Sequence, residues 1–228
     1  MKSSFIKSVI LFTALLLIPL SLLTPPSQAQ AANKKIGIIV FDGFLTGDVT
    51  GPIEVLGAAV NQPEFKNYKI TLISAHKKLK IISEEGLPLL AEKTIHDAGK
   101  YDVLIVPSAY EMKTYLENKK LIDFIKAHKN SSAVASNCSG AHLLAEAGIL
   151  NGKKATTWAG GEKDLQKNYP QVKVQTNINY VVDGNIITSN GGPVSYQAAL
   201  KLLEMLSSKS FAEKISSSIQ FDRISKTY

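Results

Sequence analysis

From Lys35 onward, short apolar runs rich in β-branched residues alternate with longer segments that have helical periodicity. The apolar runs predict strands at residues 36–41, 69–75, 103–107, 133–136, 180–182 and 186–188, with 172–175 as a further candidate. The periodic segments predict helices at residues 52–60, 111–128, 140–147, 161–167, 194–206 and 211–219. Strands that alternate with helices favour a mostly parallel sheet covered by helices. The sequence therefore predicts an α/β fold with one core, which suits a chain of 228 residues.

The segment before this pattern has the three parts of an export signal. Two lysines precede an almost uninterrupted apolar run at residues 9–23, and Ala29-Gln30-Ala31 has the small-x-small pattern that a signal peptidase cleaves. The apolar run is short for a bilayer-spanning helix of roughly 20 residues. We expect residues 1–31 to be a signal peptide and residues 35–228 to form the domain of an exported protein, periplasmic or secreted. An uncleaved N-terminal anchor is the alternative.

Charge and motifs exclude several classes of protein. The formal charge is +7, and the lysines occur in small scattered groups without interleaved aromatic residues or a nucleic-acid-binding motif. We expect no nucleic-acid partner, and no stable membrane insertion after signal cleavage. The sequence has no P-loop, dinucleotide fingerprint, HExxH motif or zinc-ligand spacing, so we expect neither a cofactor nor a metal.

Four polar segments directly follow predicted strands. They are residues 42–51, 108–109, 137–140 and 189–192. In an open α/β sheet, ligands bind beyond the carboxyl ends of the strands. We therefore expect these four segments to converge on one rim and to form the functional site.

Cys138 is the one cysteine of the chain, so an intramolecular disulfide is excluded. It lies between a predicted strand and a predicted helix that begins at Gly140, an arrangement that resembles a nucleophile elbow. The free N–H groups of a helix start favour a thiolate, and they predict a cysteine pKa below the usual value of roughly 8.5. A buried structural cysteine is the alternative, but the turn favours a reactive thiol.

Asp48 is the candidate proton-transfer partner of this thiol. We predict that it lies in a loop before the helix that starts at Pro52. There it either caps that helix, in competition with Thr50, or approaches Cys138 and exchanges protons with it. No histidine is clearly placed to act as the base; His142, one helical turn after the cysteine, is the nearest in sequence.

Three ordered motifs resemble the DJ-1/PfpI family of the class I glutamine-amidotransferase-like proteins. They are residues 41–44 with 48–55, residues 137–141, and residues 188–191. The resemblance extends from about Lys35 to the C-terminus, and the most similar branch contains isonitrile hydratases and the sensor half of AraC-type regulators. It implies a flavodoxin-like three-layer sandwich, with helices on both faces of the sheet, and a homodimer.

The resemblance also implies roles for individual residues. Cys138 is the expected nucleophile, Asp48 its acidic partner, and Ser139 a polar residue that holds the substrate or a water. The other expected substrate-binding residues are Ser108, Gly140, Trp158 and Gly191.

Three positions depart from the family pattern. Trp158 stands where members often carry histidine, which disfavours a cysteine–histidine protease mechanism. Ser108-Ala109 replaces a Gly-Gly pair after the proline of a turn, although the turn can still offer a backbone N–H to an oxyanion. Gln197 stands where many members have aspartate.

Three functions agree with these features. The first is an exported cysteine-dependent hydratase or hydrolase that acts on a small electrophile. For an isonitrile, the thiolate would attack the terminal carbon and water would release an N-substituted formamide. The second is a non-catalytic module that binds or senses a small ligand in the same pocket. The third is protection against carbonyl or oxidative stress. One fold hosts many functions, so the site has to distinguish them.

Overall fold

The computed structural model describes residues 33–224, and the predicted signal peptide lies outside these residues. A seven-stranded sheet has the order β10-β11-β7-β6-β1-β2-β5. Its strands are β1 Lys34–Val40, β2 Tyr68–Ser74, β5 Lys93–Thr94, β6 Val103–Val106, β7 Ala133–Asn137, β10 Tyr180–Asp183 and β11 Ile186–Ser189. Every neighbouring pair is parallel except β10 and β11, which form an antiparallel hairpin. The predicted mostly parallel sheet is confirmed.

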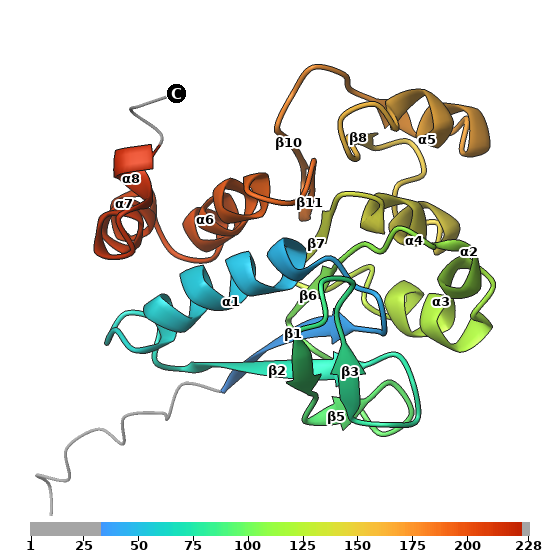
Figure 1. The fold of residues 1–228 in the computed structure, drawn as a ribbon. Helices are drawn as coiled ribbons and strands as arrows, with labels where there is room; N and C mark the ends of the chain where they lie inside the picture. The colour runs from blue at the N-terminus through green and yellow to red at the C-terminus, as the bar shows by residue number, and fades with distance from the viewer. Residues whose placement is uncertain (1–32, 225–228) are drawn as a thin grey trace, which may run out of the picture. The chain divides into compact units, whose positions relative to one another are not determined.

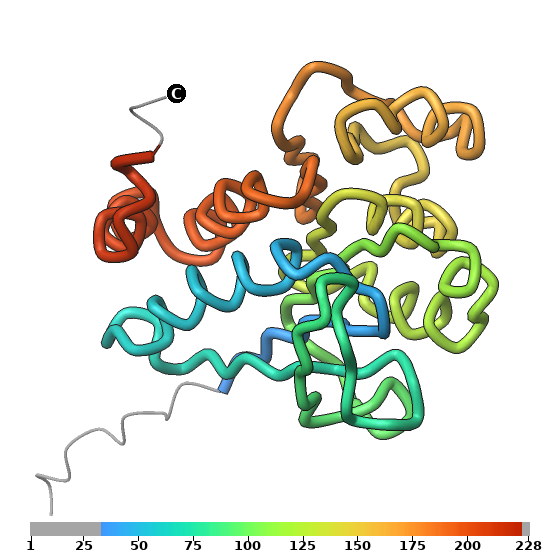
Figure 2. Tube along the Cα trace, in the orientation of Figure 1, coloured from blue at the N-terminus to red at the C-terminus, as the bar shows by residue number. Residues whose placement is uncertain are grey.

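Helices cover both faces of this sheet, as predicted (Figure 1). The first group consists of α1 Thr46–Val60, α6 Val194–Leu206 and α7 Lys209–Ser218, followed by the short α8 Phe221–Ile224. The second group consists of α2 Lys113–Leu116, α3 Lys119–Lys126 and α4 Gly140–Glu146. Figure 2 shows that parts of the chain far apart in sequence lie side by side. Helix α1, near the blue N-terminal end of the chain, lies beside α6, near the red C-terminal end.

The strand order explains why the helices divide into two groups. The connection from β1 to β2 moves along the sheet in one direction, and the connection from β6 to β7 moves in the other. Because such crossovers are right-handed, their helices lie on opposite faces. The direction reverses between β1 and β6, and doubly wound sheets bind ligands at this switch point.

The central strands are buried along their length. The residues of β6 and β7 are all buried, as are the last five of β1. A strand covered on both faces needs apolar or small residues at successive positions, which explains the continuous apolar runs in the sequence.

Several short elements escaped prediction. They are the hairpin of β3 Lys80–Ile82 and β4 Pro88–Leu90, the edge strand β5, the strand β8 Lys154–Ala155 and the helix α8. Strand β8 pairs with β9 Lys173–Val174, where a strand was predicted, and the predicted helix at residues 161–167 is α5 Glu162–Asn168. Strands of two or three residues are too short to show a clear periodicity.

The predicted single helix at residues 111–128 is wrong, because the segment forms two helices. Asn118 separates them, and its side chain accepts a hydrogen bond from the backbone N–H of Leu121 at 3.1 Å. Asparagine is a preferred N-cap residue, so it starts α3 afresh. Within residues 33–224, none of the helices combines the length and the apolar character needed to cross a bilayer.

Candidate active site

Cys138 lies at the turn between β7 and α4. Its φ of 51° is in the left-handed region that residues other than glycine rarely adopt. Its backbone N–H donates to the carbonyl of Ser189 at 2.9 Å. Gly140, at the start of α4, leaves no room for a side chain, because a Cβ there would lie 2.6 Å from the carbonyl oxygen of Val106. The strained turn therefore has the geometry of a nucleophile elbow at the carboxyl edge of the sheet.

Asp48 lies in the first turn of α1, so its predicted position in a loop before the helix is wrong. Neither it nor Thr50 caps the helix. The buried carboxylate accepts hydrogen bonds from the backbone N–H groups of Ser108 at 3.1 Å and Gly192 at 2.8 Å, and from the hydroxyls of Ser108 and Ser195. Burial raises the pKa of the Asp48 carboxyl, and the four donors act against this shift. The carboxyl is thus fixed in place and holds a proton at higher pH than an exposed aspartate does.

A proline inside α1 connects this helix to the elbow. Pro52 has no N–H to donate to the carbonyl of Asp48, four residues earlier. That carbonyl accepts a hydrogen bond from Nδ2 of Asn137 instead, at 2.8 Å. The Oδ1 atom of Asn137 accepts from the hydroxyl of Ser189 at 2.6 Å. The buried Asn137 amide therefore joins α1 to β11 one residue before the nucleophile.

Gly191 separates the thiol-bearing residue from the carboxylate. Its φ is 79°, and a Cβ at this position would lie 2.4 Å from the Cβ of Cys138 and 2.6 Å from Oδ1 of Asp48. Only glycine fits these conditions. The two groups are consequently separated by no more than the space that one side chain would fill. Gly191 is therefore a spacer between Cys138 and Asp48. Its predicted contact with substrate stays a prediction.

The electrostatic surroundings of the thiol differ from the sequence-based prediction. Burial and the negative charge of Asp48 raise the pKa of the Cys138 thiol, and hydrogen bonding with Ser108 and Ser139 opposes this shift without reversing it. The predicted lowering is therefore wrong, because burial disfavours the thiolate more than the helix start favours it. At neutral pH the resting thiol is protonated, so a neighbouring base is needed to form the nucleophile.

Two serines hold the loop after β6 against this pair. The N–H and the hydroxyl of Ser108 both bind Asp48, so the Ser108 N–H is not free to meet an oxyanion. The next N–H, that of Ala109, donates to Sδ of Met112 at 3.2 Å, which is a weak acceptor. The hydroxyl of Ser139 donates to the carbonyl of Ala109 at 3.1 Å. Ala109 thus offers the backbone donor that a substrate can attract.

A cavity of about 480 Å³ opens over Cys138 and Ser139. Its remaining walls are mostly apolar and come from Leu45, Ala109, Tyr110, Met112, Leu116, His142 and Trp158. The Nδ1 atom of His142 is buried and has no hydrogen-bond partner among residues 33–224. Burial lowers the pKa of this imidazole more than the nearby Ser139 carbonyl raises it. The size and lining suit a small ligand with an apolar substituent.

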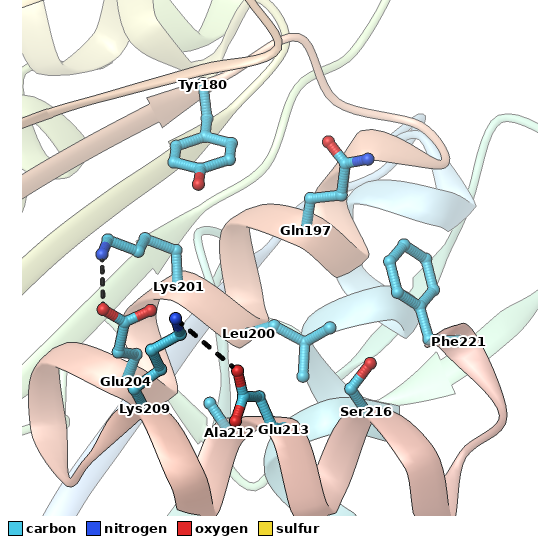
Figure 3. A pocket seen from close by; sticks show the side chains of 10 residues that line it. All are labelled: Tyr180, Gln197, Leu200, Lys201, Glu204, Lys209, Ala212, Glu213, Ser216 and Phe221. Atoms are coloured by element: carbon cyan, nitrogen blue, oxygen red, sulfur yellow. Dashed lines mark hydrogen bonds and ion pairs between the residues drawn. The ribbon is translucent and has the colours of Figure 1, made fainter. Parts of the chain in front are cut away.

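A second depression, of about 450 Å³, lies between β10 and the helices α6, α7 and α8 (Figure 3). Its charged side chains pair with one another, Lys201 with Glu204 at 2.7 Å and Lys209 with Glu213 at 3.8 Å. Gln197 lines this depression, and its side-chain oxygen accepts a hydrogen bond from Asn179. The cysteine lies elsewhere, so the departure at Gln197 does not touch the thiol.

The structure brings together the four segments that were expected to meet. Asp48 binds the segments after β6 and β11, and the backbone of Cys138 binds the end of β11. The catalytic and binding roles remain predictions. Within residues 33–224, no group of three or more His, Cys, Asp or Glu side chains is arranged to hold a metal ion.

Sequence reasoning missed four residues that support the pair. They are the Asp48 partners Gly192 and Ser195, the bridging Asn137, and Thr157, whose hydroxyl donates to the carbonyl of Cys138 at 2.9 Å. Asn137 and Gly192 lie in segments that follow strands, which was the available signal. Thr157 directly precedes Trp158, a predicted binding residue, whereas nothing in the local pattern marks Ser195.

A mostly parallel α/β sheet with a cysteine on a strained strand-to-helix turn and a buried carboxyl at the switch point defines a flavodoxin-like domain with a nucleophile elbow. The DJ-1/PfpI family model matches residues 34–205, and the chain belongs to this family. The family resemblance seen in the sequence is confirmed.

The chain is similar to proteins with different functions. It is 30% identical to an isonitrile hydratase of Pseudomonas putida over 174 residues, which cover 75% of this chain and 72% of the hydratase. It is 26% identical over 192 residues to an HTH-type transcriptional regulator of Pseudomonas aeruginosa, covering 84% of this chain and 56% of the regulator. A crystal structure of a THiJ/PfpI family protein from Pseudomonas syringae matches with a TM-score of 0.73 and 22% identity, covering 84% of this chain and 76% of that one. This last similarity supports the fold.

Proposed function

We propose that the protein is an exported, cysteine-dependent hydratase or hydrolase that acts on a small electrophile of the isonitrile type. The observation that carries this proposal is the position of Cys138 on a strained elbow at a mostly apolar cavity. Only Gly191, which has no side chain, separates it from buried Asp48. The similarity to an isonitrile hydratase supports the reaction type.

The proposed reaction begins when Asp48 takes the proton of the Cys138 thiol. The sulfur forms a bond with the terminal carbon of the isonitrile, and Asp48 returns the proton to that carbon, which gives a thioimidate. Water then adds to the same carbon, and the carbon–sulfur bond breaks. One hydrogen of the water ends on the nitrogen of the formamide product, and the other restores the thiol. The proposed proton path between the thiol and Asp48 runs through the Ser108 hydroxyl, which is hydrogen-bonded to Asp48 and affects the pKa of the thiol.

The test is to incubate the mature chain with cyclohexyl isonitrile and follow the formamide proton by NMR. We expect product with the native sequence and with Glu54→Gln, which changes an exposed carboxylate on the same helix as Asp48. Cys138→Ser and Asp48→Asn should form product at the uncatalysed rate. Equal rates for the native protein and Cys138→Ser would rule out isonitrile hydration by this thiol.

A non-catalytic sensing module is the second candidate, because the raised pKa keeps the resting thiol protonated. The similarity to a transcriptional regulator agrees with this function. If the protein is a sensing module, a ligand should raise the thermal unfolding temperature of Cys138→Ala as much as that of the native protein. If the protein is an enzyme that bonds to its substrate, the ligand should raise only that of the native protein. Protection against carbonyl or oxidative stress remains a prediction that no particular residue supports.

Export and assembly complete the proposal. We expect the mature chain to begin at Ala32 and to be recovered outside the cytoplasm, which N-terminal mass spectrometry of cell fractions tests. We also expect a homodimer by resemblance to the family, which light scattering after gel filtration tests.

A further inference from the structure

We propose that Trp158 determines the substrate class of the Cys138 cavity by stacking on a flat, apolar group attached to the electrophilic carbon. The inference rests on the proposed function, because it assumes that the substrate reacts at Cys138. It adds that an aromatic substituent is preferred over a small or non-planar one.

The indole of Trp158 lies on a platform of two glycines. A Cβ at Gly161 would lie 2.2 Å from both Nε1 and Cε2 of the ring, and a Cβ at Gly160 would lie 2.9 Å from Cζ3. A side chain at either position would displace the ring. Gly160 also has a φ of 105°, which residues other than glycine rarely adopt. The sequence Trp158-Ala159-Gly160-Gly161 therefore specifies where the ring lies.

The backbone that carries the indole is attached to the nucleophile. The hydroxyl of Thr157 donates to the carbonyl of Cys138 at 2.9 Å, and Nδ2 of Asn190 donates to the carbonyl of Thr157 at 2.6 Å. Thr157 itself is buried. The ring is thus held at a fixed place relative to the reacting sulfur, as a specificity element must be.

Trp158 keeps 40% of its residue surface exposed and lines the cavity, so its side chain is available for contact with a ligand. The apolar side chains of Leu45, Met112 and Leu116 line the same space. A flat group bound there gains apolar burial, and an aromatic pair is worth about 0.5 to 1.5 kcal/mol beyond that burial, which is about two- to tenfold in binding.

The test compares three reagents that carry the same reactive carbon. They are iodoacetamide, N-phenyliodoacetamide and N-cyclohexyliodoacetamide. In each case the Cys138 sulfur bonds to the methylene carbon, iodide leaves and the thiol proton goes to the buffer. Each second-order rate is divided by the rate of the same reagent with glutathione, so that only the contribution of the cavity remains.

Two variants remove the proposed stacking in different ways. Trp158→Leu removes the ring, and Gly161→Ala displaces it; the φ of −93° at Gly161 accepts alanine without backbone strain. Trp158→Phe keeps an aromatic ring, and Gly57→Ala adds the same methyl group at a helical position that faces open space.

We expect the native protein, Trp158→Phe and Gly57→Ala to prefer the phenyl reagent over both others. The preference should fall about two- to tenfold in Trp158→Leu and Gly161→Ala, the size of the stacking contribution. A preference that is absent from the native protein, or unchanged in both Trp158→Leu and Gly161→Ala, would overturn the inference.

This result is separable from the proposed function. A phenyl preference that depends on Trp158, together with no hydration of isonitriles, would support the specificity element and reject the reaction. Since Trp158 is the one tryptophan of the chain, quenching of its fluorescence by acetanilide, which lacks the iodine, gives a second readout without a covalent step. Quenching by acetanilide but not by acetamide is expected, and equal responses would count against stacking.

Discussion

Replacing Asp48 with asparagine removes the negative charge that raises the pKa of the Cys138 thiol. The geometry at Gly191 places Oδ1 of Asp48 and the Cβ of Cys138 at most about 5 Å apart, and two unit charges at that distance interact by about 3 kcal/mol at an effective dielectric constant of about 20. Since one pKa unit corresponds to about 1.4 kcal/mol, full ionisation of Asp48 corresponds to about two units. We expect Asp48→Asn to lower the thiol pKa by no more than this limit, because asparagine carries no charge that disfavours the thiolate.

The assay is the rate of alkylation by iodoacetamide from about pH 6 to about pH 10, a range that brackets the ordinary cysteine pKa. The midpoint of the rate profile should move to lower pH in Asp48→Asn. The control is Glu54→Gln, whose carboxylate lies on the same helix but binds Tyr196 and is exposed, so its midpoint should equal that of the native protein. A folded Asp48→Asn variant with an unchanged midpoint would refute the idea that this carboxylate holds the thiol in its protonated form.

The other predictions concern stability. Gly191→Ala should cost about 3 to 5 kcal/mol of unfolding free energy and block alkylation of Cys138, because strain and overlap add. Gly192→Ala, with a φ of 55° but open space, should cost about 1 to 2 kcal/mol; equal costs in urea unfolding would contradict the spacer role. Asn137→Ala should cost about 2 to 4 kcal/mol, because two buried hydrogen bonds lose a partner, and a cost below about 1 kcal/mol would contradict the bridge. Because folding raises the pKa of Asp48, its protonation stabilises the folded state below the ordinary pKa of 3.8, and this stabilisation is lost as the pH rises through the pKa of the folded state. Acid should therefore increase the unfolding free energy of the native protein relative to Asp48→Asn. A difference between the two proteins that does not depend on pH would show an unperturbed carboxyl.

The sheet could be predicted from the sequence because its central strands are buried on both faces, which leaves a continuous apolar run for each one. The same logic located the site, since polar residues that follow buried strands meet at one edge. Cys138 and Asp48 were found in this way. Their protonation could not be predicted, because it depends on burial and on donors such as Ser195 that come from other parts of the chain.

The start of α1 shows a different limit. A proline is tolerated in the first turn of a helix, so the sequence pattern predicted that the helix starts at Pro52. The helix begins at Thr46 because a side chain 85 positions after Pro52 in the sequence, that of Asn137, satisfies the freed carbonyl of Asp48. Prediction from local sequence therefore failed because a long-range hydrogen bond from Asn137 replaces the helix hydrogen bond that Pro52 cannot make.

This compensation makes two distant positions interdependent during evolution. Any residue other than proline at position 52 would bring an amide that competes with Asn137 for the same carbonyl oxygen. Loss of Asn137 would be tolerated better in a chain in which position 52 already carries a backbone N–H. The order in which the substitutions at positions 52 and 137 arise therefore determines whether the intermediate protein is viable. The energetic signature is a nonadditive double-mutant cycle between Pro52→Ala and Asn137→Ala, in which the double variant is more stable than the two single costs predict. A change of Asn137, the nucleophile's neighbour, would then follow a change of Pro52 rather than precede it.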